Sequence, residues 1–399
     1  MIKILFAINT LGRAGAEKSL IEILKRLDPD LYEVSLFVVT AQGELISNLP
    51  KGVRLINKQF DKSSVLDEEG KKHLKKRVLK KMFSNGSLFE NFFYLLANGI
   101  RMLASGGIKT DKLMWKVLSD ASERTDEEYD MAVAFLEGGA AYYVRDHVKA
   151  RVKTAFIHID YKSAGYTRKL DRNCYADFDR IFAVSDEVKK TFLEAYPELE
   201  ERTEVLHNII DAEKVRAMSL EECDFGPENV IKILTVNRLD SQKALNYSID
   251  ACKILKDSGL DIRWIVLGEG NRRRKLEKRI RKLGLTDVFL MPGSVENPYP
   301  YMRMADIYVH ASRFEGKSIA VQEAQILGKP ILVSDCNGNR EQVADNVDGL
   351  KCELSKEAIA ESITKLLNDE NLRLELSQNA RKKYKDTSGE LTALLSLIK

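Results

Sequence analysis

Residues that mark several classes of protein are scarce in this 399-residue sequence. Its 5 cysteines are odd in number and scattered without a C-x2-C pair. This argues against a disulfide framework or a structural zinc site and indicates a reducing cytosol. With 8 prolines and 23 glycines, the chain has no collagen-like or low-complexity composition. No stretch of about 20 residues is both apolar and uncharged, and we therefore expect no membrane-spanning helix.

The chain also has no large excess of charge of either sign, because its 63 Lys and Arg residues are balanced by 60 Asp and Glu residues. A general nucleic-acid-binding protein would be much more basic, so we expect no nucleic-acid partner. Hydrophobic residues make up 44% of the chain and charged residues 31%, which is a globular composition. The length predicts two or three domains.

Short apolar runs alternate with helix-period segments along most of the chain. The runs rich in Val, Ile and Phe predict buried parallel strands at residues 1–8, 34–39, 131–135, 154–158, 180–184, 231–236, 263–267, 288–291, 307–310 and 331–334. This alternation occurs twice and predicts an α/β protein with two doubly wound sheets. Ligands of such sheets bind beyond the carboxyl ends of the strands, so two facing sheets would form a central cleft.

These patterns predict an N-terminal domain over residues 1–210 and a C-terminal domain over 211–385. The acid-rich stretch 211–228 is interpreted as the linker between the two strand series. The second domain closes with amphipathic helices at 356–368 and 371–383, and the apolar tail 386–399 is expected to dock back on the N-terminal domain.

Residues 60–128 interrupt the strand-helix rhythm and form a predicted insertion with basic and aromatic residues. Seven Lys and Arg residues and no acid lie between residues 71 and 81, where Leu74, Val78 and Met82 fall on one helical stripe. An aromatic segment follows, so 71–104 has the composition of an interfacial segment on an anionic membrane surface. The alternative is a solvated helix packed on the first domain.

The first candidate ligand loop runs from Asn9 to Glu17, directly after the first strand. Gly15 and Ala16 open a predicted helix there, and small residues at a helix N-terminus let an anion approach the backbone. The loop does not contain G-x-G-x-x-G, so a dinucleotide site is weakly supported. A tight strand-to-helix turn explains the same residues equally well.

Two further loops carry charged residues at the carboxyl ends of predicted strands. Arg238 and Lys243 are five residues apart and could both reach one diphosphate, although surface cations are the alternative. Glu315 precedes a predicted helix capped by Ser318, and Glu323 lies about 7 Å further along its axis. A sugar nucleotide could lie across this helix start, with its hydroxyls bound to carboxylates. The alternatives are a surface acid at Glu323 or a glycosidase carboxylate pair.

Together and in this order, the motifs resemble those of retaining, Leloir-type glycosyltransferases of family 4, glycosyl transferases group 1. Bacterial capsular and exopolysaccharide enzymes belong to this group, and the resemblance covers nearly the whole chain. Glu315 and Glu323 match its Glu-x7-Glu signature, and Arg238 and Lys243 match its phosphate-binding pair. The remaining matches are Gly268-Glu269-Gly270 to a G-x-G turn, residues 207–211 to H-N-G-[IV]-D, and Gly338, Glu341 and Gly349 to a closing G…E…G stretch.

The resemblance implies the GT-B fold, in which two Rossmann-like domains face a central cleft. It implies that Arg238 and Lys243 neutralise the leaving diphosphate and that Glu323 holds the ribose. The donor sugar would be held by Glu315 and by the backbone amides of Gly316, Lys317, Ser318 and Ile319. Gly268 and Gly270 also fall in the implied donor site, and His158 matches a histidine that faces the donor sugar.

Three departures from the family pattern concern the identity of the sugar rather than the reaction. Ile209 stands where Gly is usual, Ser318 often aligns with Pro, and Lys317 replaces a commoner apolar residue. The charged residues that the reaction needs are all present.

The resemblance predicts same-face transfer of a hexosyl unit, with UDP preferred over GDP as the nucleotide. No enzyme nucleophile is expected, and a leaving-phosphate oxygen would take the acceptor's proton. We expect no cofactor and no obligatory metal, because Asp177-Phe178-Asp179 spells D-x-D but precedes a strand. His147, His310 and the cysteines are interpreted as structural.

The expected acceptor is a glycan or a polyprenyl-diphosphate-linked glycan in the synthesis of cell-surface polysaccharide such as capsule. The expected location is the cytoplasm or the inner face of the cell membrane. Two alternatives remain: a non-catalytic GT-B-like subunit that binds a membrane or partner, and a GT-B sugar-nucleotide epimerase or hydrolase.

Overall fold

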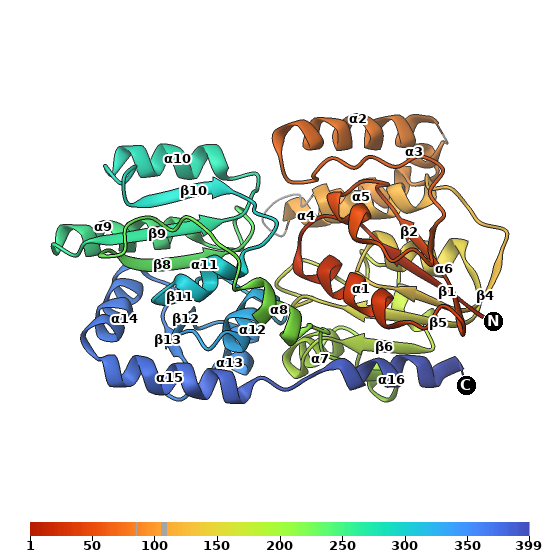
Figure 1. Cartoon of the computed structure of the whole chain (residues 1–399). Coiled ribbons are helices and arrows are strands. Elements are labelled where there is room, and N and C mark those ends of the chain that lie inside the picture. Colours follow the sequence, from red (N-terminus) through yellow and green to blue (C-terminus); the bar gives the residue numbers. More distant parts are fainter. Residues whose placement is uncertain (85, 105–109, 399) are drawn as a thin grey trace. The chain divides into compact units, whose positions relative to one another are not determined.

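The computed structural model describes residues 1–84, 86–104 and 110–398 of the chain. These residues form two compact units (Figure 1). Unit 1 consists of Met1–Ile209 and Gly389–Lys399, and unit 2 consists of Ile210–Ser388. The predicted boundaries lie one residue later at the first crossing and three residues earlier at the second. Residues 85 and 105–109 of the expected insertion lie outside the described residues.

Unit 1 is built on one sheet of seven parallel strands among its described residues. In spatial order the strands are β3 (Val53–Leu55), β2 (Tyr32–Val38), β1 (Ile2–Ile8), β4 (Glu128–Ala134), β5 (Lys149–Ile157), β6 (Arg180–Ala183) and β7 (Thr203–Val205). Its helices are α1 (Gly15–Arg26), α2 (Glu68–Ser84), α3 (Ser87–Glu90), α4 (Phe92–Ala104), α5 (Thr110–Asp120), α6 (Gly139–His147), α7 (Asp186–Leu193) and α16 (Leu391–Leu395).

Unit 2 contains a second sheet, with six parallel strands among the described residues. In spatial order they are β10 (Phe289–Gly293), β9 (Ile262–Leu267), β8 (Ile231–Val236), β11 (Ile307–His310), β12 (Ile331–Ser334) and β13 (Leu350–Cys352). The helices of unit 2 are α8 (Ala212–Met218), α9 (Leu245–Asp257), α10 (Arg273–Lys282), α11 (Tyr299–Met304), α12 (Ile319–Ile326), α13 (Asn337–Gln342), α14 (Lys356–Asn368) and α15 (Glu370–Lys383).

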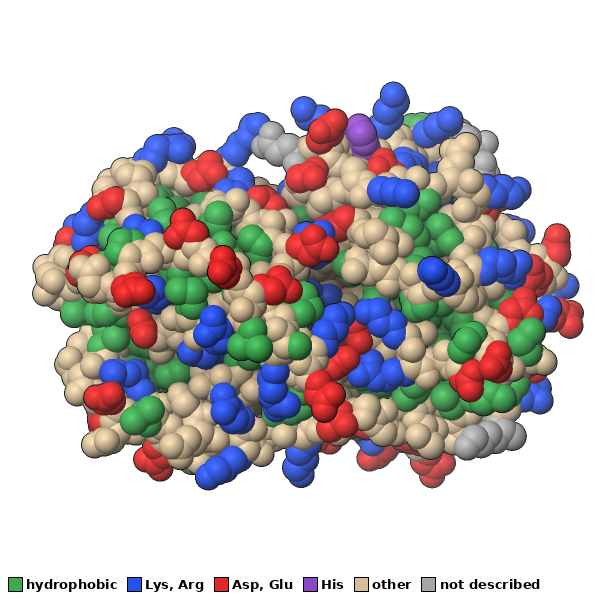
Figure 2. Space-filling model, viewed as in Figure 1, with side chains coloured by type: hydrophobic (Ala, Val, Ile, Leu, Met, Phe, Trp, Pro, Cys, Tyr) green, Lys and Arg blue, Asp and Glu red, His purple; other side chains and the backbone are tan. Residues whose placement is uncertain are grey.

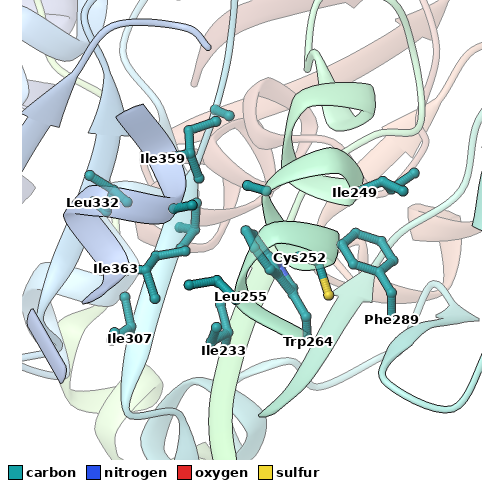
Figure 3. Close-up of a cluster of buried hydrophobic side chains, with 14 of the residues drawn as sticks. Ile233, Ile249, Cys252, Leu255, Trp264, Phe289, Ile307, Leu332, Ile359 and Ile363 are labelled. Atoms are coloured by element: carbon teal, nitrogen blue, oxygen red, sulfur yellow. The ribbon is translucent and has the colours of Figure 1, made fainter. Parts of the chain in front are cut away.

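The sheet of unit 2 is buried on both faces, as its continuous apolar strands require. Successive strand residues point to opposite faces, so Ile233 packs in one core cluster and Leu234 in another. The first cluster surrounds the fully buried Trp264 and is closed by side chains of α9 and α14 (Figure 3). The prediction of two Rossmann-like α/β sheets is confirmed.

Two predictions about the ends of unit 2 meet different outcomes. The stretch 211–228 was interpreted as a linker, but it contains α8, whose N-terminus is capped by Asp211 and whose Val215 is buried. That interpretation is wrong, because a helix of only 7 residues shows little periodicity in the sequence. The C-terminal segment packs into unit 1, where Leu391, Leu394 and Ile398 join the core beside β1.

Among the described residues, no helix combines the length and the apolarity needed to cross a membrane.

Candidate functional site

Each sheet reverses its strand order at one place, between β1 and β4 in unit 1 and between β8 and β11 in unit 2. Ligands of doubly wound sheets bind outside the carboxyl ends of strands at such a reversal. In unit 2 the loops after β8 and β11 meet there. The Arg313 amide donates to the Gln242 carbonyl at 2.8 Å, and Gln242 Nε2 donates to the Phe314 carbonyl at 2.9 Å.

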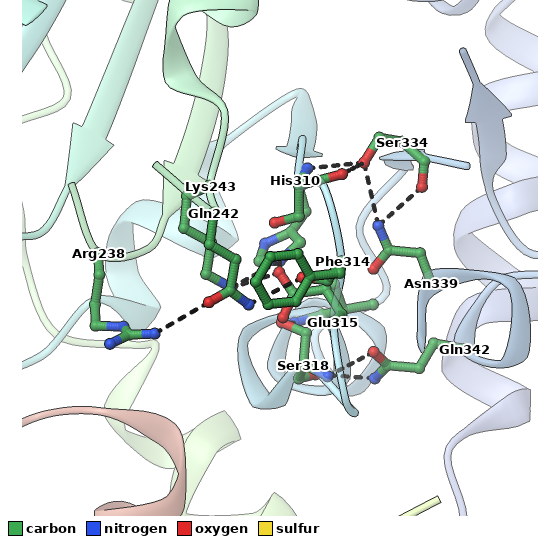
Figure 4. Close-up of polar contacts among 12 residues, drawn as sticks. Arg238, Gln242, Lys243, His310, Phe314, Glu315, Ser318, Ser334, Asn339 and Gln342 are labelled. Carbon is green, nitrogen blue, oxygen red and sulfur yellow. Dashed lines mark hydrogen bonds and ion pairs between the residues drawn. The ribbon is translucent and has the colours of Figure 1, made fainter. Parts of the chain in front are cut away.

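This contact brings together Lys243 and Glu315, which are 72 residues apart in the chain. Lys243 Nζ lies 2.5 Å from Glu315 Oε1, and the two side chains are 11% and 6% exposed (Figure 4). Burial alone would raise the pKa of Glu315, but the Lys243 ammonium and a hydrogen bond from His310 hold it well below its usual range. The site therefore keeps one buried positive and one buried negative charge in contact.

His310, at the end of β11, completes this cluster. Its Nε2 lies 3.0 Å from Glu315 Oε1. Burial, together with the Lys243 charge, lowers the pKa of His310, so the imidazole is neutral. Because Glu315 is an acceptor, Nε2 carries the proton and Nδ1 is left to accept from the Tyr308 hydroxyl at 3.5 Å. The sequence showed no partner for His310, and the structure places it against Glu315.

Arg238 lies in the same loop as Lys243 but in a different environment. Its side chain is 44% exposed, and its guanidinium is 3.4 Å from both Asp240 Oδ2 and Gln242 Oε1. Figure 4 shows Gln242 between the guanidinium and Glu315. Arg238 is therefore a half-exposed cation at the rim, whereas Lys243 is the buried one.

Gly268 and Gly270 hold the loop that carries Arg238. Gly268 has φ +148°, and a Cβ there would lie 1.9 Å from the Asn237 carbonyl oxygen. A Cβ at Gly270 would lie 2.3 Å from the Leu239 carbonyl oxygen. The Leu239 amide in turn donates to the Glu269 carbonyl at 2.8 Å. These glycines allow close backbone packing between two loops, and a contact with a ligand is not needed to explain them.

The residues at the start of α12 are largely engaged with the protein itself. The Ser318 amide donates to Gln342 Oε1 at 2.6 Å, and its hydroxyl caps the helix by accepting from the Val321 amide. The Ile319 side chain is buried in a small core cluster, and Lys317 pairs with Glu341 at 3.7 Å. The Ser318 amide, expected to hold the donor sugar, is therefore already used.

Gly316 lies in the loop before α12. A Cβ on Gly338 would come within 2.0 Å of the Gly316 carbonyl oxygen. The absence of a side chain at Gly338 thus lets the loop after β11 pack closely against the start of α13.

Glu323 and Asn237 complete the polar residues of unit 2 near this reversal. Glu323 is 2% exposed, and its Oε1 accepts from the Tyr299 hydroxyl at 2.8 Å. Asn237 follows β8 directly, and both polar atoms of its side chain are buried without a partner among the described residues. Unsatisfied buried amide groups are costly, so Asn237 is a candidate ligand contact that its place before Arg238 could have indicated.

In unit 1, His158 follows β5 beside the other reversal. Burial lowers the pKa of His158 to about 3, against the opposing effect of a hydrogen bond with the Phe135 backbone. The imidazole is therefore neutral, and its Nε2 is buried with no partner among the described residues. Such a nitrogen can accept a hydrogen bond from a ligand hydroxyl.

Glu137, after β4, positions this histidine and had no signal in the sequence. Its Oε1 accepts hydrogen bonds from the backbone amides of His158 and Ile159, the latter at 3.0 Å. Its backbone carbonyl accepts from Asn9 Nδ2 at 2.8 Å, so the loops after β1, β4 and β5 are linked. Burial raises the pKa of Glu137, against the lowering effect of these amides.

Gly15 and Ala16 form the first turn of α1, as the sequence predicted for a helix start after β1. The N-cap residue Ala14 provides no side-chain cap, and Glu17 in the first turn accepts from the Thr10 hydroxyl at 2.8 Å. In the D-x-D triplet, Asp179 Oδ2 accepts from the Lys153 amide at 2.7 Å, which ties it to the neighbouring strand β5.

Comparison with known proteins finds a family match in unit 2 and similar glycosyltransferases. Residues 225–383 match the family model of glycosyl transferases group 1. An α-1,4-N-acetyl-D-galactosaminyltransferase of Campylobacter jejuni, named for an acceptor on PP-undecaprenol, is 25% identical over 391 residues, which are 97% of this chain and 94% of that protein.

A second Campylobacter jejuni protein is named as a diphospho-undecaprenol 4-alpha-N-acetylgalactosaminyltransferase. It is 31% identical over 186 residues, which are 46% of this chain and 49% of that protein. The chain spans about half the length of several of the curated relatives that it matches.

Among solved structures, that of Anabaena HepE in complex with UDP-glucose matches with a TM-score of 0.70 and 18% identity, covering 99% of this chain and 100% of that one. At this identity the match concerns the fold, which is the GT-B fold.

Proposed function

We propose that this chain is a retaining glycosyltransferase, because residues 225–383 match the family model of glycosyl transferases group 1. It transfers a hexosyl unit from a UDP-sugar to a glycan on a polyprenyl diphosphate during the synthesis of cell-surface polysaccharide. One observation carries the proposal: Lys243 and Glu315 meet as a buried ion pair where the strand order of unit 2 reverses, with Arg238 in the same loop.

The choice of substrates follows the relatives. HepE was crystallised with UDP, with UDP and glucose, and with UDP-glucose, which supports a UDP-sugar donor. Two Campylobacter relatives and an Escherichia coli galactosyltransferase are named for acceptors on undecaprenyl diphosphate, which supports a lipid-linked glycan.

The charges of the site suit the departure of a nucleoside diphosphate. The Lys243 ammonium has three donors, so it can keep its contact with Glu315 and bind a phosphate oxygen. Arg238, which is half exposed, can swing its planar guanidinium onto the same diphosphate. Both interactions strengthen as negative charge grows on the leaving group, and this lowers the barrier.

Glu315 recognises the sugar by accepting hydrogen bonds from its hydroxyls, because Lys243 and His310 keep it ionised. As the C1–O bond to UDP breaks, the acceptor oxygen bonds to C1 from the same face. The acceptor's proton passes to an oxygen of the leaving phosphate, so no enzyme nucleophile is required. We assign the neutral His158 Nε2 in unit 1 to a sugar hydroxyl and Glu323 to the ribose.

The test is a donor panel. The purified chain is incubated with UDP- and GDP-hexoses, with and without a polyprenyl-diphosphate-linked glycan, and nucleotide release is followed with mass spectrometry of the products. The anomeric configuration of the product is read by NMR. We expect acceptor-dependent UDP release and an α-linked product from an α-linked donor, at a rate that EDTA does not change.

Variants locate the site. Lys243→Ala should lower kcat/KM by about 10²–10³, the usual loss when one charge-stabilising group is removed. Lys275→Ala on the exposed side of α10 is the matched control. Turnover unchanged in Lys243→Ala would overturn the site. UDP release without acceptor would indicate a hydrolase, and an isomerised donor an epimerase. No turnover with any donor would indicate a non-catalytic subunit.

A further inference from the structure

Helix α4 is amphipathic, but unlike an ordinary surface helix it buries its polar side and exposes its apolar side. Its polar residue Asn98 and its Tyr94 are buried against the protein. Its large apolar side chains face outward: Phe93 is 80% exposed and Leu103 is 64% exposed. A helix that turns its apolar side away from the core needs another apolar medium to cover it.

The outward residues form one continuous stripe along α3 and α4. They are Phe89, Phe92, Phe93, Leu96, Ile100 and Leu103, which we call the apolar face. Apart from the adjacent pair Phe92 and Phe93, successive members are three or four residues apart, which is the spacing of residues on one side of a helix. Phe83 and Leu79 at the end of α2, 68% and 43% exposed, precede this face in the chain, and α2 contacts α3. Most exposed large apolar residues of the described chain belong to this region.

Hydrogen bonds and ion pairs attach the helices of the apolar face to the rest of unit 1. Asn91, between α3 and α4, donates to Asp120 Oδ2 at 2.7 Å at the end of α5. Asp120 also pairs with Lys116 and with His147, the latter at 3.1 Å. These contacts fix α3 and α4 to α5 and α6, so the exposure of the apolar face is a feature of the packed protein.

Helix α2 supplies the charges beside this face. Its own apolar stripe does not face outward, because Met82 is buried and Leu74 and Val78 are half buried. The apolar stripe of α2 therefore packs against the protein, and membrane binding by residues 71–104 stays a prediction that rests on other residues. Its outer side carries the exposed cations Lys72, Lys75, Lys76 and Lys80, and Figure 2 shows basic side chains gathered over α2.

We propose that α2, α3 and α4 form a docking surface for an anionic lipid bilayer, with the apolar face in the acyl boundary and the α2 lysines at the headgroups. The charge balance supports a lipid occupant: residues 71–104 hold eight Lys and Arg residues and a single acid, Glu90. A second copy of the chain would bring like charges together. A protein partner is less suited because lysine is depleted in protein interfaces. Amphipathic segments with Lys on one side and Phe and Leu on the other are typical of interfacial binding.

This surface does not depend on the proposed reaction, so binding and turnover can fail separately. The experiment is flotation of the full chain with vesicles of phosphatidylcholine alone or with about 30% phosphatidylglycerol. We expect binding to the anionic vesicles only, and a loss of binding as salt rises, because surface attraction is screened within about 10 Å at 0.1 M salt.

Two triple variants separate the contribution of the apolar side chains to vesicle binding from that of the lysine charges. Phe89→Ser with Phe93→Ser and Ile100→Ser removes much of the apolar face, and we expect the partition coefficient to fall at least about tenfold. The matched control is Leu31→Ser with Leu220→Ser and Leu374→Ser, whose side chains lie elsewhere in the chain and are 56%, 72% and 54% exposed. The control should bind like the wild type.

The charge variant is Lys72→Glu with Lys76→Glu and Lys80→Glu, and it should also lose at least about tenfold in partition. Its control makes the same change of net charge on α10, as Lys275→Glu with Lys278→Glu and Lys282→Glu. Circular dichroism and thermal unfolding show that each variant is folded.

Insertion is tested separately with a tryptophan probe. Leu96→Trp should shift its emission to the blue on anionic vesicles and be quenched by brominated lipid, whereas Leu220→Trp in unit 2 should not change. If the apolar variant floats like the wild type, or if Leu96→Trp is not quenched, the proposal is wrong. Sedimentation that shows a wild-type dimer converted to a monomer by the apolar variant, with vesicle binding unchanged, would assign the face to a second copy.

Discussion

Lys243 and Glu315 carry the two buried charges of the candidate site, and they are in contact. Both residues are nearly inaccessible to water, and each charge is compensated mainly by the other. A buried ion pair contributes little net stability, but removing one partner leaves a charge without compensation. The pair therefore makes the site sensitive to single substitutions at either position.

Lys243→Met should lower the free energy of unfolding of unit 2 by about 3–5 kcal/mol, because it leaves the Glu315 carboxylate buried and unpaired. The double variant Lys243→Met with Glu315→Leu should regain most of that loss. Urea unfolding measures both, with the exposed Lys275→Met as control. Additive losses in the double variant would contradict the coupling.

The same pair makes stability depend on pH. Because the folded pKa of Glu315 is lowered, the pair stabilises the native state above the ordinary carboxyl pKa and loses this effect as pH falls through the folded value. Urea midpoints of the wild type should therefore drop on acidification more steeply than those of Lys243→Met.

His310 acts on Glu315 rather than on a substrate, so it is a positioning residue. His310→Ala removes the hydrogen bond that helps to lower the pKa of Glu315, and the acid limb of kcat/KM should move to higher pH. We expect a loss of about tenfold in kcat/KM, the size of one hydrogen bond to a charged group. His310→Gln, which keeps an N–H donor, should restore most of the profile. Identical pH profiles for His310→Ala and the wild type would assign His310 a packing role only.

At the scale of elements, the loops at the carboxyl ends of β8, β9 and β11 pack directly against one another. The backbone near Leu239 packs directly on the Gly268-Glu269-Gly270 turn, and Gln242 binds the loop after β11. Movement in any of these loops would displace Arg238 or Lys243. Such close approach of backbones depends on the absence of a side chain at the two glycines.

Gly270→Ala tests the importance of this close packing between loops. The added Cβ would lie 2.3 Å from the Leu239 carbonyl oxygen, so the two loops must separate. We expect a loss of about 1–3 kcal/mol in the stability of unit 2 and weaker UDP binding by calorimetry. Gly389→Ala, where the new Cβ meets nothing within 4 Å, is the control and should leave UDP binding unchanged.

At the scale of the whole molecule, the chain leaves unit 1 at residue 209 and returns to it at residue 389. The returning segment buries Leu391, Leu394 and Ile398 in the core beside β1, and Glu390 accepts a hydrogen bond from the His207 amide. Unit 1 is thus completed only after unit 2 has been synthesised.

Removal of residues 389–399 should destabilise unit 1 by about 3 kcal/mol or more, because three buried apolar side chains are lost, and should leave unit 2 unchanged. The chain's two tryptophans report the units separately, since Trp115 lies in unit 1 and Trp264 in unit 2. Urea unfolding of Trp264→Phe and Trp115→Phe forms, each with and without the truncation, measures the two effects. Equal destabilisation of both units would contradict this assignment.

The sequence alone determined the fold class and the elements with strong local patterns. Strands β8, β11 and β12 and helix α14 have the predicted bounds, because continuous apolar runs and amphipathic spacing are local properties. The motifs also placed Arg238, Lys243 and Glu315 at strand ends. Strands β3, β7 and β13 were missed, because three residues are too few to show a period.

Only the tertiary structure decided how side chains distant in sequence are paired. Lys243 meets Glu315, 72 residues away, Glu137 accepts from the Ile159 amide after another strand, and the Ser318 amide is occupied by Gln342, 24 residues away. The outward apolar face of α4 likewise cannot be read from spacing, since periodicity defines a face but not the side on which the core lies. Which face is buried depends on what packs against it, and that is a property of the folded chain.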